Sequence, residues 1–513
     1  MKRYIALILC AVLLFSLSGC KKESKKGKKT SETAVQETEC ELTLLYSKTD
    51  GFNPYTAKSS ENRQLCSLLF DPLLNLKSDF TVEYCIASSA EVSASACTVH
   101  LRALNFTDGS PITSSDVVYS YSLARGAVYS GYPAALSEIT AVSAPDPYTV
   151  VFTAAYLDPY ILNLLTFPII KNGTAGRTDS DGVELAPVGS GKYTVSADGT
   201  SLIRNDNYYG VAGDIKTVKL LNAPDSESIS HYIEAGTADL YFTDADAGQI
   251  VRMSGKRSQV NINRLVYIGV NSTYGDLSSK EARYAISSAV DRKEIVTSAY
   301  YGVASSATSF FNPSLADARP TASLEETANA EITVENLSKI GYNVKDEDGY
   351  YVNKSDKRLS FSLLVNSDNV SRLSAARLVA AQCKNAGIEI TVEEENFQNY
   401  TNRLASGNFQ LYIGEIQILP NMDLAPLVVP GGTASYGVTE TPTGNNQLTV
   451  SQAIAKYRSG ALGVADLSGV MLTAMPQIPL CYRNGLLFYS DKIQSGVEGL
   501  PSNIYYSIEK YKF

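Results

Sequence analysis

Residues 264–302 change from a strand-like pattern of apolar and polar positions to a helical one. Leu265, Tyr267 and Val270 lie among other apolar residues and predict a strand. Residues 272–276 read Ser-Thr-Tyr-Gly-Asp, a group of turn formers that ends this strand. The spacing of the next apolar residues is that of a helix, so the segment is interpreted as a strand followed by helices.

Two helices are expected after the turn. Ser278 is the expected N-cap of the first, with Glu281 at capping-box spacing. Its apolar residues share one face, which predicts close packing: Ala282, Ala285, Ile286 and Ala289. Asp291 and Glu294 start a second helix and Gly302 ends it. We interpret the whole unit as the place where the chain leaves one lobe and begins another, with a ligand in the cleft between them.

The second half of the chain continues this alternation. Strands are expected at residues 359–365, 388–392 and 411–418, and helices at residues 371–385 and 400–406. Strands that alternate with helices in this way predict α/β units and a largely parallel sheet.

The remaining expected elements lie on both sides of this region. They are strands at residues 42–47 and 98–104, helices at 63–69 and at 156–165 (with a proline inside it), a loop at 426–450, and an apolar strand at 479–489 that returns the chain to the first lobe.

The first 40 residues have the pattern of an export signal and a tether. Lys2 and Arg3 precede an apolar run at residues 5–17 that is short for a membrane span. Leu-Ser-Gly then precedes Cys20, which resembles the lipobox of bacterial lipoproteins and implies that Cys20 is lipidated; the alternative is an ordinary cleaved signal. Residues 21–40 are rich in lysine, and are expected to form a disordered tether that either contacts anionic headgroups or is simply solvated.

Composition limits the class of protein. A chain of 513 residues exceeds the size of one hydrophobic core, so at least two core-bearing lobes are expected. The net charge of −9 argues against nucleic acid as a partner, because phosphate binding needs a basic face.

Catalytic and metal-binding patterns were sought and not found. The two histidines, His100 and His231, have no cysteine or second histidine at metal-ligand spacing, and neither accompanies a nucleophile elbow. The glycine-rich turn at residues 189–193 lacks the Walker A spacing and is interpreted as structural. We therefore expect no enzyme activity, no cofactor and no metal. Cys85 and Cys97 are close enough for a hairpin disulfide, and a pair of buried thiols is the equal alternative.

The segment from Asp108 to Val118 carries a more specific motif. It reads DGSPITSSDVV, in which a turn leads to a helix with Thr113 as N-cap and Asp116 at its third position. This pattern resembles the signature region of the bacterial extracellular solute-binding proteins of family 5, the oligopeptide-, dipeptide- and nickel-binding lipoproteins of ABC importers. Further segments resemble the same family: residues 146–152, 187–193, 204–210, 233–240, 283–292, 387–390 and 397–409.

The resemblance implies an α/β, two-lobed periplasmic-binding-protein-like fold of type II, hinged by crossover strands. The implied parts are a signal peptide at residues 1–20, a tether at 21–40, lobe I at 41–56, 185–267 and 481–513, an inserted subdomain at 57–184, and lobe II at 268–480.

The implied ligand site departs from that of the peptide-binding members. Those members hold the ligand's α-amine with an acid shortly after the strand that matches residues 411–418. Here Ile418 or Leu419 falls at that place, and Glu415 and Asp423 flank it. A peptide with a free amine therefore requires Glu415 to take the role. The candidate cleft residues are Tyr46, Asn271, Tyr274, Glu415, Gln417 and Tyr436.

The function implied by the resemblance is capture and delivery of a solute. The protein is expected to be a monomer anchored to the cell membrane by a lipid and facing the extracellular or periplasmic side. It would capture a peptide or another small polar solute and deliver it to ABC permease subunits. The alternatives are a ligand-sensing lipoprotein on the same fold and a surface hydrolase.

Overall fold

The computed structural model describes residues 41–513 except 181, 183, 245–254, 321–322 and 441–447. The expected signal peptide, Cys20 and the tether lie outside the described residues. Residues Cys40–Phe513 form one unit. Within the part of the chain that is described, no helix is both long enough and apolar enough to cross a membrane.

The main sheet has eleven strands, which come from residues 41–46, 193–306 and 360–489. Its order is β17-β16-β18-β12-β19-β11-β1-β10-β9-β8, and β13 pairs with β19 at one side. The strands are β1 (Glu41–Tyr46), β8 (Tyr193–Val195), β9 (Ser201–Arg204), β10 (Thr217–Asn222), β11 (Leu240–Thr243), β12 (Lys256–Val270), β13 (Ala304–Ser306), β16 (Ser360–Asn366), β17 (Glu389–Glu395), β18 (Leu411–Gln417) and β19 (Ile478–Tyr489).

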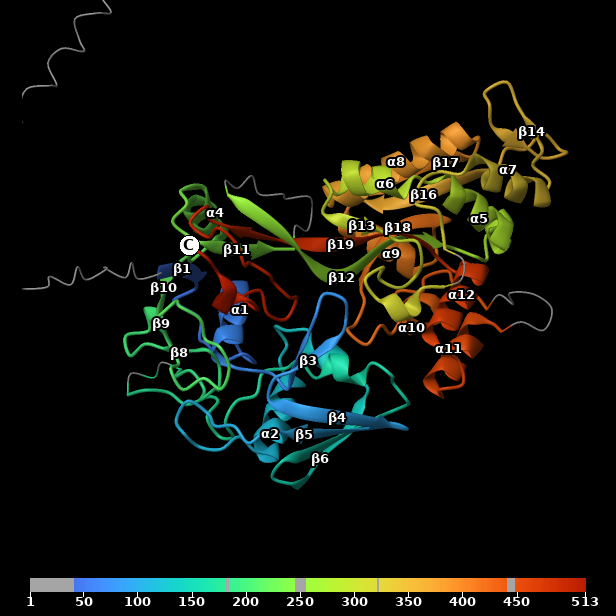
Figure 1. Cartoon of the computed structure of the whole chain (residues 1–513). Helices are drawn as coiled ribbons and strands as arrows, with labels where there is room; N and C mark the ends of the chain where they lie inside the picture. The colour runs from blue at the N-terminus through green and yellow to red at the C-terminus, as the bar shows by residue number, and fades with distance from the viewer. Residues whose placement is uncertain (1–40, 181, 183, 245–254, 321–322, 441–447) are drawn as a thin grey trace, which may run out of the picture. The chain divides into compact units, whose positions relative to one another are not determined.

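The long strands β12 and β19 are the connection between the two ends of this sheet (Figure 1). They run antiparallel along most of their length. On its other side β19 pairs with β11, and on its other side β12 pairs with β18. The pairing shifts register between Asn261 and Arg264, where Asn263 has a positive φ of 53°. This bulge adds a local bend to β12.

The prediction of a largely parallel sheet is wrong. Parallel pairs occur where β1 lies between β10 and β11 and where β16 lies between β17 and β18. Every pair made by β12 or β19 is antiparallel. The alternation of strands and helices was a correct guide only for residues 360–417, because the two crossover strands return from distant parts of the chain.

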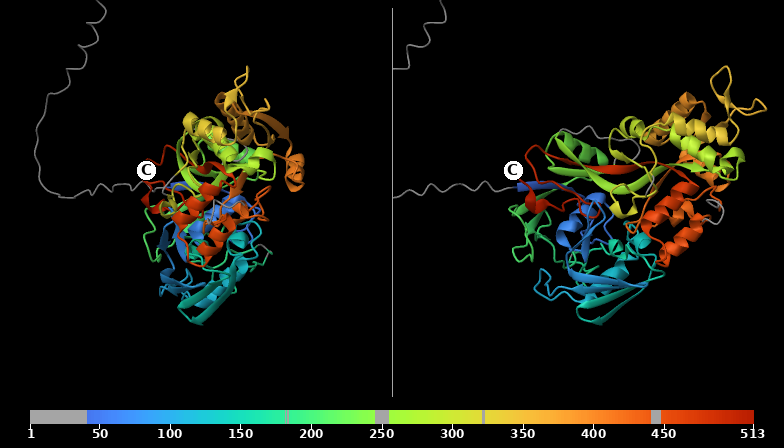
Figure 2. Two further views of the ribbon diagram at one scale, coloured as in Figure 1. Left: turned by 90° about the vertical axis from the view of Figure 1, so that its right-hand side faces the viewer. Right: turned by 45° about the vertical axis from the view of Figure 1, so that its right-hand side comes forward.

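The helices predicted in the second half are present as α5 (Lys280–Ala289), α6 (Arg292–Glu294), α8 (Val370–Ala386) and α9 (Phe397–Ala405), and α6 passes into a π-helical turn at Ile295–Ala299. Other helices there were not predicted: α7 (Ala330–Lys339), α10 (Ala425–Val428), α11 (Val450–Arg458) and α12 (Val464–Ala474). Helix α8 packs on β16 and β17, and α11 packs beside α12 (Figures 1 and 2). The short strands β14 (Val344–Lys345) and β15 (Tyr351–Val352) form a separate hairpin.

The predicted N-cap of α5 is displaced by one residue. Ser279, not Ser278, caps the helix by accepting a hydrogen bond from the Glu281 backbone N–H. The reason is a 3-10 turn, Gly275–Ser278, that takes up Ser278 before α5 begins. The predicted apolar face of α5 is buried, and Asp291 caps α6 as expected.

The segment predicted to be an inserted subdomain contains a four-stranded sheet of its own. Its order is β4-β5-β7-β6. The elements of this segment are α1 (Ser60–Leu69), β2 (Leu74–Leu76), β3 (Val82–Tyr84), β4 (Ala87–Ser93), β5 (Ala96–Leu101), α2 (Ser114–Ala124), α3 (Tyr132–Ala135), β6 (Ile139–Asp146) and β7 (Thr149–Ala154). Helix α4 (Ser226–Glu234) lies later in the chain, outside this segment. The lobe boundaries proposed from the sequence stay predictions.

Local signals in this segment gave mixed results. The capping box of Thr113 and Asp116 is present at the start of α2. The helix expected at residues 156–165 is wrong, because only a 3-10 turn, Ile161–Leu164, forms there. Pro159 disfavours helical geometry at Asp158, so the chain stays irregular before the turn.

The glycine-rich turn and the cysteine pair noted in the sequence have structural explanations. A Cβ on Gly191 would lie 2.4 Å from the Leu68 carbonyl oxygen, so the glycine-rich turn serves close packing against the end of α1. Cys85 and Cys97 are free thiols rather than a disulfide. Cys97 is buried, and the Cys85 sulfur accepts a hydrogen bond from Asn75.

Candidate functional site

A cluster of charged side chains lies at the centre of the main sheet, where β12, β18 and β19 are neighbours. Arg264 of β12 is opposite Arg483 of β19, and Glu415 of β18 is opposite Val266. Arg372, from the first turn of α8, approaches from outside the sheet. We call Arg264, Arg372, Glu415 and Arg483 the Glu415 cluster.

The carboxylate of Glu415 is shared unequally among the arginines of this cluster. Arg483 Nη1 lies 2.7 Å from Oε1, and Arg264 Nη1 lies 3.4 Å from the same oxygen. Arg372 Nε lies 3.9 Å from Oε2. The side chains of Glu415 and Arg483 are only 7% and 4% exposed, whereas that of Arg264 is 32% exposed. The inner pair is therefore a buried ion pair, and Arg264 forms its more accessible edge.

The cluster also reaches toward β11. Arg483 Nη2 donates to the backbone oxygen of Asp244, and Arg264 Nη2 lies 3.8 Å from the Asp244 carboxylate. Asp244 directly follows β11, in the part of the chain predicted to be lobe I. The cluster thus links side chains from both predicted lobes through the crossover strands.

Two buried polar groups at the cluster have no hydrogen-bond partner among the described residues. One is Nε of Arg372, a member of the cluster, and the other is the hydroxyl of Tyr300, which is not a member. Burial raises the pKa of Tyr300, and the charges of Cys481 and Glu415 act in the same direction while Arg483 and Arg372 oppose them. Buried groups of this kind are rare in proteins and indicate a water, an ion or a ligand that would satisfy them.

Glu415 and Gln417, both predicted as cleft residues, lie on β18 beside Arg264. Gln417 Oε1 accepts a hydrogen bond from Arg264 Nε at 3.1 Å, and Gln417 Nε2 donates to the Ile262 backbone oxygen at 2.8 Å. Gln417 therefore orients Arg264. Glu415 is engaged by arginine at 2.7 Å, so the role proposed for it, as the acid that receives a ligand amine, would require it to exchange this partner.

Asn271 and Tyr436 come together at the other end of β12. The Asn271 side chain donates to the Phe409 backbone oxygen and accepts from Thr273, so its hydrogen bonds shape the chain after β12. Tyr436 is 38% exposed and meets the ring of Tyr412 edge-on. Gly437 approaches Asn271 so closely that an added Cβ would lie 2.6 Å from its Cα.

Tyr274 and Tyr46 have different surroundings. Tyr274 is 50% exposed and precedes the 3-10 turn before α5. Tyr46 ends β1, is buried, and stacks on Phe52 at 6.3 Å. Its strand lies between β10 and β11, away from the strands that carry the Glu415 cluster.

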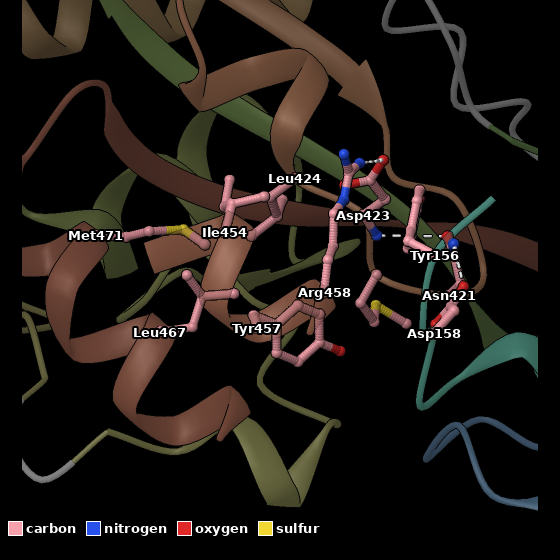
Figure 3. Close-up of a pocket in the computed structure, with 11 residues that line it drawn as sticks. Tyr156, Asp158, Asn421, Asp423, Leu424, Ile454, Tyr457, Arg458, Leu467 and Met471 are labelled. Carbon is pink, nitrogen blue, oxygen red and sulfur yellow. Dashed lines mark hydrogen bonds and ion pairs between the residues drawn. The ribbon is translucent and has the colours of Figure 1, made fainter. Parts of the chain in front are cut away.

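A small pocket lies where the segment before the first 3-10 turn of the insertion meets the chain after β18 (Figure 3). Asn421 donates to Asp158 at 2.8 Å, and Arg458 pairs with Asp423 at 3.1 Å. Arg458 also lies 4.0 Å from the ring centroid of Tyr156. Leu424, Ile454, Leu467 and Met471 lie together on the other side of Arg458, and Met422 also lines the pocket.

Asp423, one of the two acids that flank the position expected for the amine-binding acid, lies in this pocket and already has a partner there. Asp423 is paired with Arg458 and accepts a hydrogen bond from the Ala425 backbone N–H. Burial raises the pKa of Asp158, and the charge of Asp423 adds to the shift. The pocket therefore joins the predicted insertion to predicted lobe II through polar contacts.

Arg264, Arg372, Arg483 and Tyr300 were not predicted as site residues, because no local pattern marks them. They come from separate elements, and only the register of β12 against β18 and β19 brings them to Glu415. Among the described residues, no group of histidine, cysteine or acidic side chains is arranged to hold a metal ion.

Comparison with known proteins places these features in a family. Residues 81–430 match the model of the bacterial extracellular solute-binding proteins, family 5. The oligopeptide-binding protein AppA of Bacillus subtilis is 23% identical over 411 residues, which cover 75% of this chain and 74% of AppA. Protein XP55 of Streptomyces lividans is 24% identical, over 68% of this chain and 66% of XP55.

Solved structures share the fold. The unliganded open form of the periplasmic murein tripeptide binding protein MppA superposes with a TM-score of 0.73 at 18% identity, covering 92% of this chain and 96% of MppA. A nickel ABC transporter structure from Bacillus halodurans gives 0.71 at 18% identity, covering 92% and 98%. The two-lobed α/β fold of type II predicted from the sequence is confirmed. With a family match over more than half of its length, the chain belongs to the bacterial extracellular solute-binding proteins of family 5.

Proposed function

We propose that the protein is the lipid-anchored substrate-binding component of an ABC importer, and that it captures a peptide or another small polar solute between its lobes for delivery to the permease. Family membership supports capture outside the cytoplasm. The observation that carries the proposal is the Glu415 cluster, in which charged side chains of β12, β18 and β19 meet Arg372 of α8, with the unsatisfied Tyr300 hydroxyl beside them. Closure of lobes over such groups lets them bind a polar solute away from water.

The two histidines lie apart from the Glu415 cluster in the chain. His100 lies in β5, where Nδ1 is 3.4 Å from the Thr149 hydroxyl. His231 lies on α4 against the ring of Tyr232. The proposal of solute capture uses neither of them.

We retain the predicted cleft residues as a proposal, with distinct roles. Tyr274 and Tyr436 are exposed enough to contact a solute. Glu415 and Gln417 hold Arg264. Asn271 and Tyr46 support the chain around them through a hydrogen bond and a stacked ring, respectively.

A solute panel tests capture. Peptides, sugars and nickel salts should be screened by thermal unfolding, and a bound solute is expected to raise Tm by a few degrees, since saturation at about 100 Kd adds about 2.7 kcal/mol. Tyr274→Ala and Tyr436→Ala should reduce the shift, whereas Tyr301→Ala, at a similarly exposed tyrosine, should not. Turnover of a substrate with no shift by any solute would instead indicate a surface hydrolase.

The lipid anchor has a separate test. Cys20→Ala is expected to move the protein from the membrane fraction to the soluble fraction, because the proposed acyl chains attach to that sulfur. Cys10→Ala, which changes the other leader cysteine, should leave the protein in the membrane fraction. Equal partition of both variants with the wild type, measured by detergent phase separation, would contradict the anchor.

A further inference from the structure

The Glu415 cluster contains more guanidinium groups than its single glutamate can hold closely. Arg483 takes the shortest contact with Glu415, at 2.7 Å. Arg264 and Arg372 are left at 3.4 and 3.9 Å from the same carboxylate. Arg264 has further acceptors in Gln417 and, at 3.8 Å, in the Asp244 carboxylate. Arg372 is the less exposed of the two, at 17%, and a charge that is mostly removed from water is stabilised by an added acceptor.

The two unsatisfied groups at the cluster are both hydrogen-bond donors. Among the residues that the structure describes, the buried Arg372 Nε–H has no hydrogen-bond acceptor, and the Tyr300 hydroxyl, on a side chain that is 5% exposed, has no partner. Tyr300 directly follows the π-helical turn Ile295–Ala299, which packs against α8 and β19, the elements that carry Arg372 and Arg483. A group that satisfied both would have to be an acceptor.

We propose that the solute carries an anionic group, a carboxylate or a phosphate, which is received by Arg372, Tyr300 and the accessible edge of Arg264. This inference rests on the proposed function and names the chemistry of its ligand. Arginine suits the role because its planar fork binds carboxylate and phosphate oxygens in pairs. Gln417 keeps the Arg264 fork in position from the other side.

The same geometry disfavours recognition through a ligand amine. Glu415 lies within 4 Å of three guanidinium groups, so an ammonium brought to it would meet their positive charges. Asp423 is already paired with Arg458. The anion of the solute, and not its amine, is therefore the determinant of binding.

Chemical modification of a solute mixture tests this directly on the intact protein. The probe is yeast extract in three forms: untreated, N-acetylated to remove amines, and methyl-esterified to remove carboxylates. The untreated and acetylated forms are expected to raise Tm equally. If the anion is a carboxylate, the esterified extract should need at least a tenfold higher concentration than the untreated extract to give the same shift in Tm. If the anion is a phosphate, esterification should have little effect, and added inorganic phosphate should suppress the shift in Tm because it competes for the arginines.

Variants locate the site. Arg372→Met and Arg264→Gln are expected to weaken the response to untreated extract at least tenfold. Arg377→Met is the matched control, because Arg377 lies on the same helix and makes only an exposed pair with Glu394. Circular dichroism would show that each variant is folded, and the extract comparison on the wild type stands without them.

Each outcome has a defined meaning. If the esterified form binds as well as the untreated form and phosphate does not compete, or if acetylation abolishes binding, the anion site is wrong and solute capture stands. If no form of the extract shifts Tm, capture itself fails, and the anion site fails with it. If only the esterified form loses binding and Arg372→Met reproduces that loss, the proposal is supported.

Discussion

Replacement of Arg283 by methionine is expected to lower the free energy of unfolding by at least about 3 kcal/mol. Arg283 is 1% exposed and makes no ion pair that the structure records within the described residues. Its Nε donates to the Met475 oxygen, Nη2 to the Ala474 oxygen, and Nη1 to the oxygens of Leu277 and Ser278. Methionine would leave these carbonyls without a donor, and each buried acceptor lost in this way costs about 1–3 kcal/mol.

The positive charge of Arg283 is stabilised by backbone carbonyls at the C-terminus of α12. Ala474 and Met475 are the last residue and the C-cap of α12, where unpaired carbonyls and the helix dipole make the environment negative. Burial lowers the pKa of the guanidinium to about 10, so it stays charged at neutral pH. Arg283→Lys should restore less than half of the loss, since an ammonium cannot reach carbonyls spread around the planar fork.

Urea unfolding followed by circular dichroism measures this effect. Arg377→Met on α8 is the control, because its ion pair with Glu394 is exposed and should change stability by no more than about 0.5 kcal/mol. Equal stability of the Arg283→Met variant and the wild type would show that the buried carbonyls find other donors.

Substitution of Asp71 by asparagine is expected to change how stability depends on pH. Asp71 is buried at the end of α1, where burial raises the pKa of its carboxyl to about 7, against the opposing effects of Lys192 and of hydrogen bonds from Tyr209, Tyr208 and Ser190. In the unfolded chain the pKa of an aspartate is about 3.9. The folded protein therefore binds a proton between these values that the unfolded chain does not.

The sign of the effect follows from this difference. The stability contributed by the protonated carboxyl is fully present below about pH 4 and is lost as pH rises through 7, by up to about 1.4 kcal/mol per unit. Asparagine cannot ionise, so the variant should lack this loss. We expect Asp71→Asn to be more stable than the wild type at pH 8, by roughly 1–3 kcal/mol, and no more stable at pH 5.

Thermal or urea unfolding at pH 5, 6, 7 and 8 checks this prediction. Asp198→Asn is the control, because Asp198 is exposed and hydrogen bonds from Ser196 and Thr200 lower the pKa of its carboxyl to about 2. Its substitution should leave the slope between pH 5 and 8 unchanged. Parallel curves for the wild type and Asp71→Asn would contradict a titration of Asp71 in this range.

Local patterns predicted local structure well where adjacent residues decide it. The capping box of α2 depends only on Thr113 and Asp116, three positions apart, and both bonds form. The choice between Ser278 and Ser279 at α5 depends on a preceding 3-10 turn, which propensity alone does not reveal. The family motif at residues 283–292 predicted its helices, but not that both of its arginines are buried against backbone carbonyls.

The site was less predictable because its contacts are distant in the chain. Glu415 was predicted to be a cleft residue, and that stays a prediction; its partners Arg264 and Arg483 lie 151 and 68 positions away in the chain. Their meeting depends on the antiparallel register of β12 and β19, and the sequence favoured parallel pairing. From its own strand alone, Glu415 was the candidate to bind a ligand amine. The guanidinium groups around it in the fold favour an anionic ligand group instead.

The bulge in β12 has a mechanical consequence for recognition. Asn263, with its positive φ, immediately precedes Arg264 in the strand that joins the two parts of the sheet. A bulge bends its strand and raises the local twist, so the irregular pairing sets the direction in which Arg264 leaves β12. We expect a change in the bend at Asn263 to move this guanidinium relative to Glu415, which would couple the shape of the crossover strands to the proposed binding of a solute.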